Sequence, residues 1–350
     1  MKITRVKIEN FRGIKSAELH LPNHVVLVGD NNTGKSTILE AIDLVLGPER
    51  LRRPFPINEH DFYAGEYITS EKELVLIKVE VVISDLSEEQ LLHFGGHIEW
   101  WNKETCDVLT APPAETTDAP NVDPALRLLF EGKYDEEEDG FVGQTFFMSP
   151  QNINGELDVF RTWDKRLCGF LFLRTLRTGS RALSLERGSL LDIILRLQEM
   201  RLTMWEDVLG ELRELSVAEK EDLGVSAILE QVQDAVRKFV PVEWAENPHI
   251  RVSDLTREHL RKTLTVFMGT GEKNSAGSEY AAPFGHQGTG TINTLVLALL
   301  AMIAELKQNV IFAMEEPEIA IPPHTQRRIV DRVREMSAQA IFTSHSPYVL

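Results

Sequence analysis

The sequence predicts an α/β fold, in which a mixed sheet with flanking helices is interrupted by a helical insert. Short apolar stretches of strand type alternate with amphipathic helical stretches near both ends of the chain. A glycine-rich loop joins one of the first strands to the first helix. Between residues 183 and 262 the apolar side chains recur with a helical period instead. Alternation of strand and helix on both sides of such a segment is typical of a sheet covered by helices.

The first part of the chain predicts strands around one helix. Residues 4–9 and 17–21 alternate between apolar and polar side chains, and residues 23–28 form an apolar run of buried-strand type. Residues 35–46 carry apolar side chains on one helical face. Residues 74–83 are rich in valine and isoleucine, which predicts another strand. The proline-rich residues 111–124 and the acidic residues 131–140 predict surface loops.

The rest of the chain predicts packed helices and then a return to alternation. Two or three helices are expected before residue 240. Residues 291–307 predict an apolar helix, 309–314 a buried strand, 325–336 an amphipathic helix and 339–343 a last strand. We therefore expect an N-terminal lobe over residues 1–182, a helical insert over 183–262 that serves dimerisation, and a C-terminal lobe over 263–350.

Composition excludes several classes of protein. With 37 basic and 54 acidic residues the net charge is -17, which argues against a wholly basic nucleic-acid-binding protein but leaves a local basic patch open. The chain has two cysteines and no apolar leader, so a disulfide-rich secreted protein is not expected and a cytoplasmic location is. No apolar run reaches the roughly 20 residues that span a bilayer, so no membrane partner is expected.

The stretch Gly29-Asp-Asn-Asn-Thr-Gly-Lys-Ser36 matches the phosphate-loop pattern G-x-x-x-x-G-K-[ST] in the required strand–loop–helix context. Glycines let successive backbone N–H groups face a phosphate chain, and the helix that follows adds its positive end. Lys35 is expected to reach the β- and γ-phosphates, and Ser36 to bind Mg²⁺. The predicted nucleotide-binding residues in this loop are Asn31, Asn32, Thr33, Gly34, Lys35, Ser36 and Thr37.

Two later strands end in polar residues that suit the same chemistry. Residues 310–314 are apolar and run into Glu315 and Glu316. The first acid would hold Mg²⁺, and the second would act as the general base on the attacking water; the alternative is a strand end capped by solvated acids. Residues 340–342 lead to His345, which we expect to contact the γ-phosphate or the attacking water rather than to serve a structural role alone.

A second glycine-rich turn, with Gly288, Thr289 and Gly290, opens the apolar helix at residue 291. Glycines and a hydroxyl at a helix N-terminus can bind an anion, and one phosphate loop does not need two such sites. We therefore expect this turn to serve a nucleotide held by another copy of the chain. The alternative is an ordinary turn with Thr289 or Thr291 as the N-cap.

The order of these motifs, preceded by Asn10-Phe-Arg-Gly13, resembles an ABC-type P-loop ATPase head of the RecF/SMC group and, within it, the OLD (overcoming lysogenization defect) family of ATP-dependent nucleases. The resemblance implies ATP as the nucleotide, Arg12 near the phosphates, His345 as γ-phosphate sensor, and Gly288, Thr289 and Gly290 acting in trans in a homodimer or higher oligomer. It implies that a Toprim nuclease domain follows residue 350 and cleaves DNA with Mg²⁺ or Mn²⁺, in phage defence and with an accessory protein as a further partner.

Some features depart from the family pattern and leave alternatives open. The second glycine-rich turn, called the signature turn below, reads His286-Gln-Gly-Thr-Gly290 in place of the family's Leu-Ser-Gly-Gly-Gln. Glu315 stands where the family usually has Asp. For the family's glutamine loop, only Gln144 and Gln151 are candidates. A RecF- or SMC-like DNA-repair ATPase without nuclease activity is one alternative, and a nucleotide-held assembly platform with little hydrolysis is another. Six arginines predict either a phosphate-binding stripe or a solvated face: Arg174, Arg177, Arg181, Arg187, Arg196 and Arg201.

Overall fold

The computed structural model describes residues 1–48, 56–109, 121–149, 155–173, 184–186, 189–198, 200–214, 225–236, 256–273, 275, 277–306, 310–316 and 323–346. The chain forms two compact units, one made of Met1–Gly179 with Gly288–Leu350 and the other of Ser180–Gln287. The expected insert, residues 183–262, lies within the second unit, which also takes in the chain as far as Gln287. Within the described part of the chain, no helix combines the length and the apolar character needed to cross a membrane.

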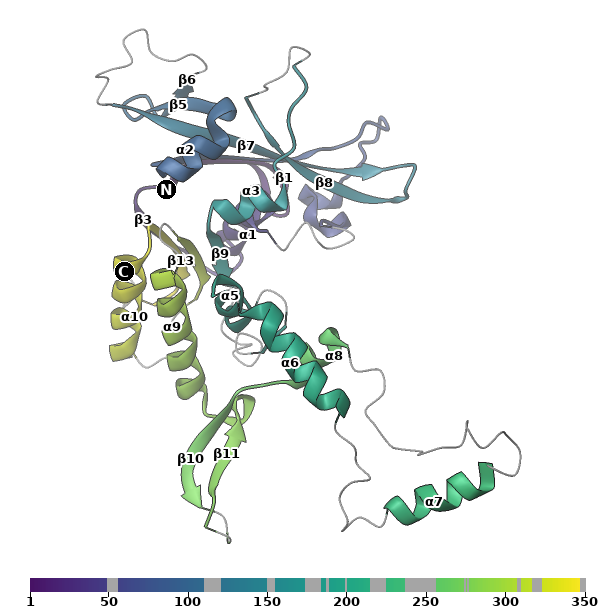
Figure 1. The fold of residues 1–350 in the computed structure, drawn as a ribbon. Coiled ribbons are helices and arrows are strands. Elements are labelled where there is room, and N and C mark those ends of the chain that lie inside the picture. Colours follow the sequence, from purple (N-terminus) through teal and green to yellow (C-terminus); the bar gives the residue numbers. More distant parts are fainter. Residues whose placement is uncertain are drawn as a thin grey trace. The chain divides into compact units, whose positions relative to one another are not determined.

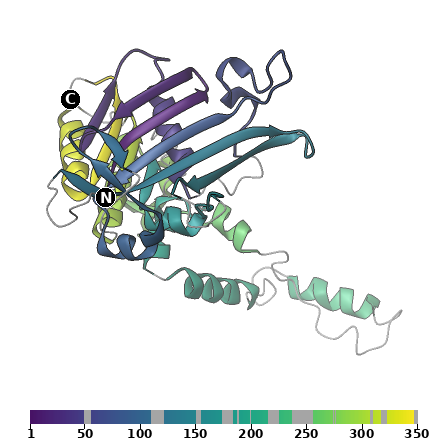
Figure 2. The same ribbon diagram turned by 90° about the horizontal axis from the view of Figure 1, so that it is seen from above.

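An antiparallel sheet forms one layer of the first unit (Figure 1). Its strand order is β2-β1-β4-β7-β5-β6, with β8 paired to β7. The long β7–β8 hairpin is clear when the molecule is viewed from above (Figure 2). The strands are β1 (Lys2–Phe11), β2 (Ile14–His20), β4 (Ile77–Ser84), β5 (Ile98–Asn102), β6 (Asp107–Leu109), β7 (Val122–Asp135) and β8 (Gly140–Phe147).

A smaller sheet of four parallel strands has the order β3-β13-β12-β9. These strands are β3 (His24–Val28), β9 (Phe170–Leu173), β12 (Ile311–Glu315) and β13 (Gln339–Ser344). Strands distant in sequence thus become neighbours, because helices connect parallel strands. The predicted α/β class is confirmed, with the parallel and antiparallel strands in two separate sheets.

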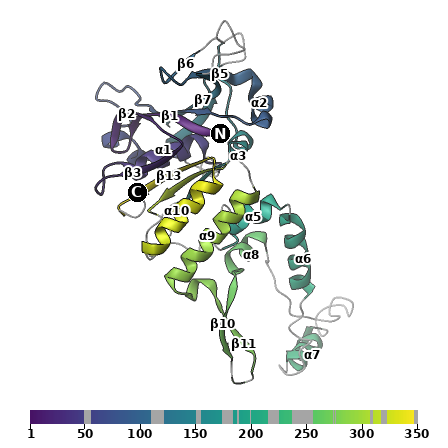
Figure 3. The same ribbon diagram turned by 90° about the vertical axis from the view of Figure 1, so that its left-hand side faces the viewer.

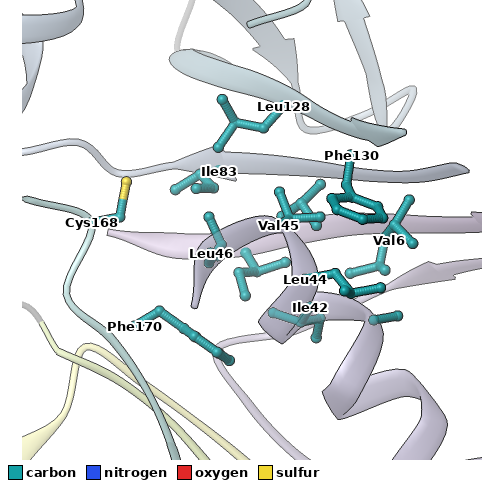
Figure 4. Close-up of a cluster of buried hydrophobic side chains, with 14 of the residues drawn as sticks. Val6, Ile42, Leu44, Val45, Leu46, Ile83, Leu128, Phe130, Cys168 and Phe170 are labelled. Atoms are coloured by element: carbon teal, nitrogen blue, oxygen red, sulfur yellow. The ribbon is translucent and has the colours of Figure 1, made fainter. Parts of the chain in front are cut away.

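Helix α1 (Lys35–Leu46) lies between the two sheets and supplies the centre of the core (Figure 4). Its bounds agree with the prediction. Most of the apolar face that the sequence indicated is fully buried, with Ile42, Val45 and Leu46 against residues of both sheets, while Ile38 is partly buried. Burial of each such side chain contributes about 1.5–3 kcal/mol. The helix that carries the phosphate loop is therefore held firmly at its far end.

Two more helices of this unit pack together beside the parallel sheet (Figure 3). They are α9 (Thr289–Leu306) and α10 (Pro323–Met336), and α10 contacts β13. The other helices in the described part of this unit are short: α2 (Glu88–Phe94), α3 (Thr162–Leu167) and the 3-10 turns η2 (Glu59–Asp61), η3 (Tyr63–Gly65) and η4 (Gly95–His97). His93 of α2 lies 2.8 Å from Asp164 of α3, which joins the two.

One buried side chain ties the two sheets together. The amide of Gln339, at the start of β13, accepts a hydrogen bond from Ile3 N (2.8 Å) and donates to Ile3 O (2.9 Å) and Pro22 O (2.9 Å). Gln339 is fully buried, so water does not reach these groups. The strand β1 of the antiparallel sheet is thereby fixed to β13, one of the two inner strands of the parallel sheet.

A buried lysine caps the far end of α1. Lys165 of α3 donates from Nζ to Leu44 O (3.0 Å) and to Thr145 Oγ1 (3.0 Å), and it has no exposed surface. The last carbonyls of a helix lack partners within the helix, and this ammonium group satisfies one of them. Burial lowers the pKa of Lys165 to about 7, although the charges of Asp43 and Cys168 act in the opposite direction.

The second unit contains the insert helices α5 (Leu190–Leu197), α6 (Arg201–Glu214), α7 (Val225–Val236) and α8 (Arg257–Thr263). A small core joins Leu185, Trp205, Leu209 and Leu260. Arg261 lies over the Trp205 ring, 5.2 Å from its centroid, and 3.5 Å from Asp192. The unit ends in the hairpin of β10 (Phe267–Lys273) and β11 (Glu279–Pro283), followed by the 3-10 turn η9 (Phe284–His286).

The structure corrects the acidic loop predicted over residues 131–140, and only the last residues of the proline-rich loop predicted over 111–124. Residues 110–120 lie outside the described residues, but β7 already begins at Val122 and continues to Asp135, where an acidic loop was expected. The turn between β7 and β8 is only residues 136–139. Leu126, Leu128 and Phe130 alternate into the core, and this alternation outweighs the charge of the residues between and after them.

Candidate nucleotide site

The parallel sheet brings the predicted site residues to one edge. In the strand register Val28 pairs with Ser344, Thr343 pairs with Glu315, and Met314 pairs with Leu173. The carboxyl ends of all four strands are therefore level. The phosphate loop, the paired acids and His345 each follow one of these ends directly, which is where ligands bind in open α/β sheets.

The phosphate loop has the backbone that its sequence predicts. Asn32 and Gly34 adopt left-handed conformations, with φ of 66° and 91°. Such residues between ordinary ones turn successive N–H groups to the same side. The side chain of Thr33 donates to Asp30 O (2.9 Å), which closes the loop. No side chain caps the start of α1 at Gly34, so its first N–H groups face the loop.

Lys35 and Ser36 differ in their surroundings. Lys35 is buried, and its Nζ donates to two carbonyls of its own loop, Gly29 O at 2.8 Å and Asp30 O at 2.6 Å. Ser36 is exposed on the first turn of α1. Asn31, Asn32 and Thr33 are exposed as well, and Thr37 is half-buried. The ammonium of Lys35 thus occupies the loop interior, where a phosphate chain would meet it.

The two adjacent acids are held differently. Glu315 is the last residue of β12 and is buried. Glu316 leaves the strand in a left-handed conformation (φ 44°), which costs about 1–2 kcal/mol in a residue with a Cβ. Its N–H donates to Thr343 O (2.9 Å) and to Thr343 Oγ1 (3.3 Å). One acid therefore stays in the sheet while the other turns away from it.

His345 lies beside the second acid, with its Nε2 3.7 Å from Glu316 Oε1. The loop that carries His345 is held by its neighbours: Ser346 N donates to Ser344 Oγ (2.9 Å), and Ser346 Oγ donates to Gln326 Oε1 on α10 (2.7 Å). The imidazole and the carboxylate predicted to act on the same water are thus adjacent.

Arg12 is held by two carboxylates. It lies in the turn between β1 and β2 with φ 50°, and its backbone N donates to Asp61 O (2.8 Å). Its Nε donates to Asp61 Oδ1 (2.8 Å), and one terminal nitrogen lies 2.7 Å from Glu40 Oε2. Partial burial acts to lower the pKa of Arg12, but Asp61 and Glu40 outweigh it and hold the pKa above its ordinary value. Glu40 is one turn beyond Ser36 on α1, so Arg12 sits beside the phosphate-loop helix.

The signature turn stands at the start of α9. Gly288 and Gly290 are exposed, and a methyl group added at either would meet no atom within 4 Å. Gly288 O accepts from Ile292 N (3.1 Å), which begins the helix. The Thr289 side chain lies outside the described set. Whether this turn contacts a nucleotide in trans stays a prediction.

The oxygen ligands present suit Mg²⁺. In the portion of the chain that the structure covers, no group of three or more His, Cys, Asp or Glu side chains could hold a metal ion without other ligands. Magnesium bound with a nucleotide does not need such a group, because one or two protein oxygens and the phosphates suffice. The Ser36 hydroxyl comes after β3, the Glu315 carboxylate is at the end of β12, and β13 lies between these two strands. Both oxygens are at the carboxyl edge of the parallel sheet and fit that requirement.

Gln144, one candidate for the glutamine loop, does not join the site. Gln144 lies in β8 of the antiparallel sheet, opposite Glu131. Gln151 lies outside the described residues, as do Arg174, Arg177, Arg181 and Arg187 of the predicted stripe. Sequence reasoning missed Thr343, Glu40 and Asp61. A hydroxyl at the end of an apolar strand and an acid on the apolar face of α1 were the signals available for the first two.

The chain is similar in sequence to one protein family and to parts of several known proteins. A family model described as an AAA ATPase domain matches residues 1–141 and 192–350. "Uncharacterized protein YbjD" of Escherichia coli (strain K12) is 38% identical over 77 residues, 22% of this chain and 14% of that protein. The DNA double-strand break repair Rad50 ATPase of Methanopyrus kandleri is 51% identical over 65 residues, 18% of this chain and 7% of that protein. The chain thus matches only a small part of each of these relatives.

The solved structures to which the chain is similar include SMC heads. The SMC head bound to the C-winged helix domain of ScpA gives a TM-score of 0.49 at 12% identity, covering 99% of this chain and 90% of that one. The SMC head domain from Thermotoga maritima gives 0.41 at 12% identity, covering 100% and 91%. The family model spans the phosphate loop, both acids and His345. The chain belongs to the AAA ATPase domain family.

Proposed function

We propose that this chain binds ATP with Mg²⁺ and hydrolyses it, as an ABC-type head that works in pairs. The observation that carries the proposal is the level register of β3, β13 and β12. It brings a complete phosphate loop, two acids and a histidine to one edge of the sheet. Each of these groups has a separate part in phosphoryl transfer to water.

Each residue of the proposed site would have its own role. Lys35 would exchange the carbonyls of Gly29 and Asp30 for β- and γ-phosphate oxygens. Ser36 and Glu315 would hold Mg²⁺, which neutralises phosphate charge when bound. Glu316 would accept a proton from the attacking water, and His345, 3.7 Å from that carboxylate, would contact the γ-phosphate. Arg12 would lie near the phosphates, because its guanidinium contacts Glu40 on α1, the helix that follows the phosphate loop.

A second copy would complete the site. The turn of Gly288, Thr289 and Gly290 stands at the start of α9, where a helix N-terminus can bind an anion, and a Cβ added at either glycine would meet no atom within 4 Å. A turn of this kind can approach a nucleotide held by another molecule without first displacing a side chain. We propose that ATP joins two copies through this turn, in a homodimer or a larger assembly.

Steady-state phosphate release tests the hydrolysis. Glu316→Gln should lower kcat by about 100-fold or more and leave ATP binding intact, because general-base catalysis contributes about 10²–10⁴-fold. Lys35→Ala should abolish binding. Glu335→Gln, the same change at an exposed position of α10, is the matched control. Equal rates for the natural protein and Glu316→Gln would show that Glu316 is not the base and would favour a platform that holds ATP without turnover.

We further propose that the ATPase controls a DNA-cleaving Toprim domain beyond residue 350, as in the OLD family. The order of the motifs supports this, as does the absence of a long coiled-coil pattern from the sequence. The sequence beyond residue 350 should then hold a strand-end Glu and an Asp-x-Asp pair. Nicking of supercoiled plasmid with Mg²⁺ or Mn²⁺ by the protein extended through that region would support the proposal.

A second candidate is a DNA-repair ATPase without nuclease activity. The match to the Methanopyrus kandleri Rad50 ATPase favours it. Under this alternative the plasmid stays intact with either metal, while ATP changes the affinity of the protein for DNA. A gel-shift titration with and without ATP, at several salt concentrations, measures that change.

A further inference from the structure

Glu316 is the proposed base, and its backbone has an unusual conformation. The residue follows directly after β12 with φ 44°, although it is not a glycine. Residues other than glycine rarely adopt this left-handed backbone conformation, and they keep it only where the surrounding structure enforces it. Some neighbouring group must therefore hold the turn in place.

The neighbouring strand supplies that group. The N–H of Glu316 is shared between two acceptors of one residue, Thr343 O at 2.9 Å and Thr343 Oγ1 at 3.3 Å. A regular parallel ladder offers a backbone carbonyl only. The hydroxyl is an additional acceptor on β13, an inner strand of the sheet, and Thr343 is 1% exposed, so water does not replace it.

The turn decides where the carboxylate goes. Glu315, still in the strand and paired with Thr343, is buried. Glu316 leaves the strand and places its Oε1 3.7 Å from Nε2 of His345. A threonine side chain is stiff about χ1, because its Cβ carries two heavy atoms, so the acceptor stays where the turn needs it.

We propose that Thr343 is a positioning residue for hydrolysis: its hydroxyl holds the left-handed turn at Glu316 and so aims the carboxylate at the attacking water. The inference rests on the proposed ATPase function. Thr343 touches neither substrate nor metal in this role and acts only through Glu316.

Thr343→Val removes the hydroxyl and keeps the shape of the side chain. Loss of one buried hydrogen-bond acceptor predicts a fall in kcat for phosphate release of about tenfold. KM for ATP and the affinity for a non-hydrolysable analogue should change less than about twofold, because the phosphate loop is untouched. Thr343→Ser keeps the acceptor and should recover most of the rate. Thr4→Val is the matched control, since Thr4 Oγ1 also makes a buried hydrogen bond, to Val82 O (3.2 Å), on a different sheet.

A double-mutant cycle separates positioning from a general structural effect. With Glu316→Gln already present, Thr343→Val should produce no further loss of kcat, since the base it aims is gone. Thermal unfolding of each variant shows that the comparison is made on folded protein. If Thr343→Val does not fold, Thr343→Ala and Thr343→Ser carry the same comparison.

The outcomes test the proposed ATPase function and the positioning role of Thr343 separately. No ATP hydrolysis by the natural protein, or no effect of Glu316→Gln, overturns the proposed function. Normal hydrolysis with a strong effect of Glu316→Gln, but full activity of Thr343→Val, overturns the role of Thr343 alone. Equal losses from Thr343→Val in both backgrounds also overturn it, because they would mean that the hydroxyl acts independently of Glu316.

Discussion

Lys165 makes the free energy of unfolding depend on pH, with a sign that follows from its burial. Burial lowers its pKa to about 7, against an ordinary value of 10.5. Between these two values the unfolded chain holds a proton that the folded chain has released. Stability therefore rises with pH across this window. The contribution is fully present above the unfolded-state pKa and is lost as the pH falls through about 7.

The size of the effect follows from the same two values. Each unit of difference in pKa corresponds to about 1.36 kcal/mol. Integrating the linkage relation from about pH 7 to about pH 9 predicts a gain of about 2 kcal/mol from this one group. Lys165→Met removes the titrating group and keeps a long apolar stem. The free energy of unfolding of the natural protein, minus that of Lys165→Met, should therefore grow by about 2 kcal/mol over those two pH units.

Urea denaturation at a series of pH values, followed by tryptophan fluorescence, measures this difference. Lys15→Met, at an exposed position of β2, is the control and should give a difference that stays level with pH. Other titrating groups, including the partly buried N-terminus, are common to both proteins and cancel. A level difference for Lys165→Met would refute the reasoning, because Lys165 would then be as protonated in the folded chain as in the unfolded one.

Three further substitutions test the packing and the signature turn. Gly143→Ala would place a Cβ 2.5 Å from the Phe130 ring, so the urea midpoint should fall by the equivalent of about 1–3 kcal/mol. Gly288→Ala meets nothing within 4 Å, so thermal stability should be unchanged while ATP-dependent dimerisation, measured by light scattering, is lost. Dimerisation that survives this change would remove the turn from the interface. Gln339→Leu leaves the Ile3 N–H and the carbonyls of Ile3 and Pro22 without their hydrogen-bond partner. Chemical denaturation should therefore show that the free energy of unfolding falls by about 3 kcal/mol. An unchanged midpoint would mean that stability does not depend on this link between the two sheets.

The sequence predicted those parts of the fold that depend on neighbours along the chain. In α1 and in the strand before it, apolar residues recur at intervals of one to four positions, and such short intervals can be recognised in the sequence. The strand ends that carry Glu315 and His345 were found in the same way. Their meeting at one edge follows from the rule that ligands bind at the carboxyl ends of parallel strands.

Features that depend on distant partners could not be predicted. Gln339 binds a residue 336 positions away, and nothing near it in the sequence indicates that contact. The left-handed turn at Glu316 is likewise held by Thr343, on another strand. The β7–β8 hairpin was missed for a different reason: its outward acids are typical of a loop, and the inward apolar residues showed their role only once paired with β4.

The strand order of the parallel sheet has a consequence for how the protein is made. β3 occupies an edge of this sheet, and its partner there is β13; the backbone of Ala340 reaches the His24 side chain across 316 positions of sequence. A ribosome completes β3 and the phosphate loop long before it reaches β13, the strand that pairs with β3. Contacts between such distant segments form slowly, and their apolar surfaces stay exposed until they do. A chain translated only as far as the phosphate loop therefore carries β3 without its partner strand, and its exposed apolar surface favours aggregation.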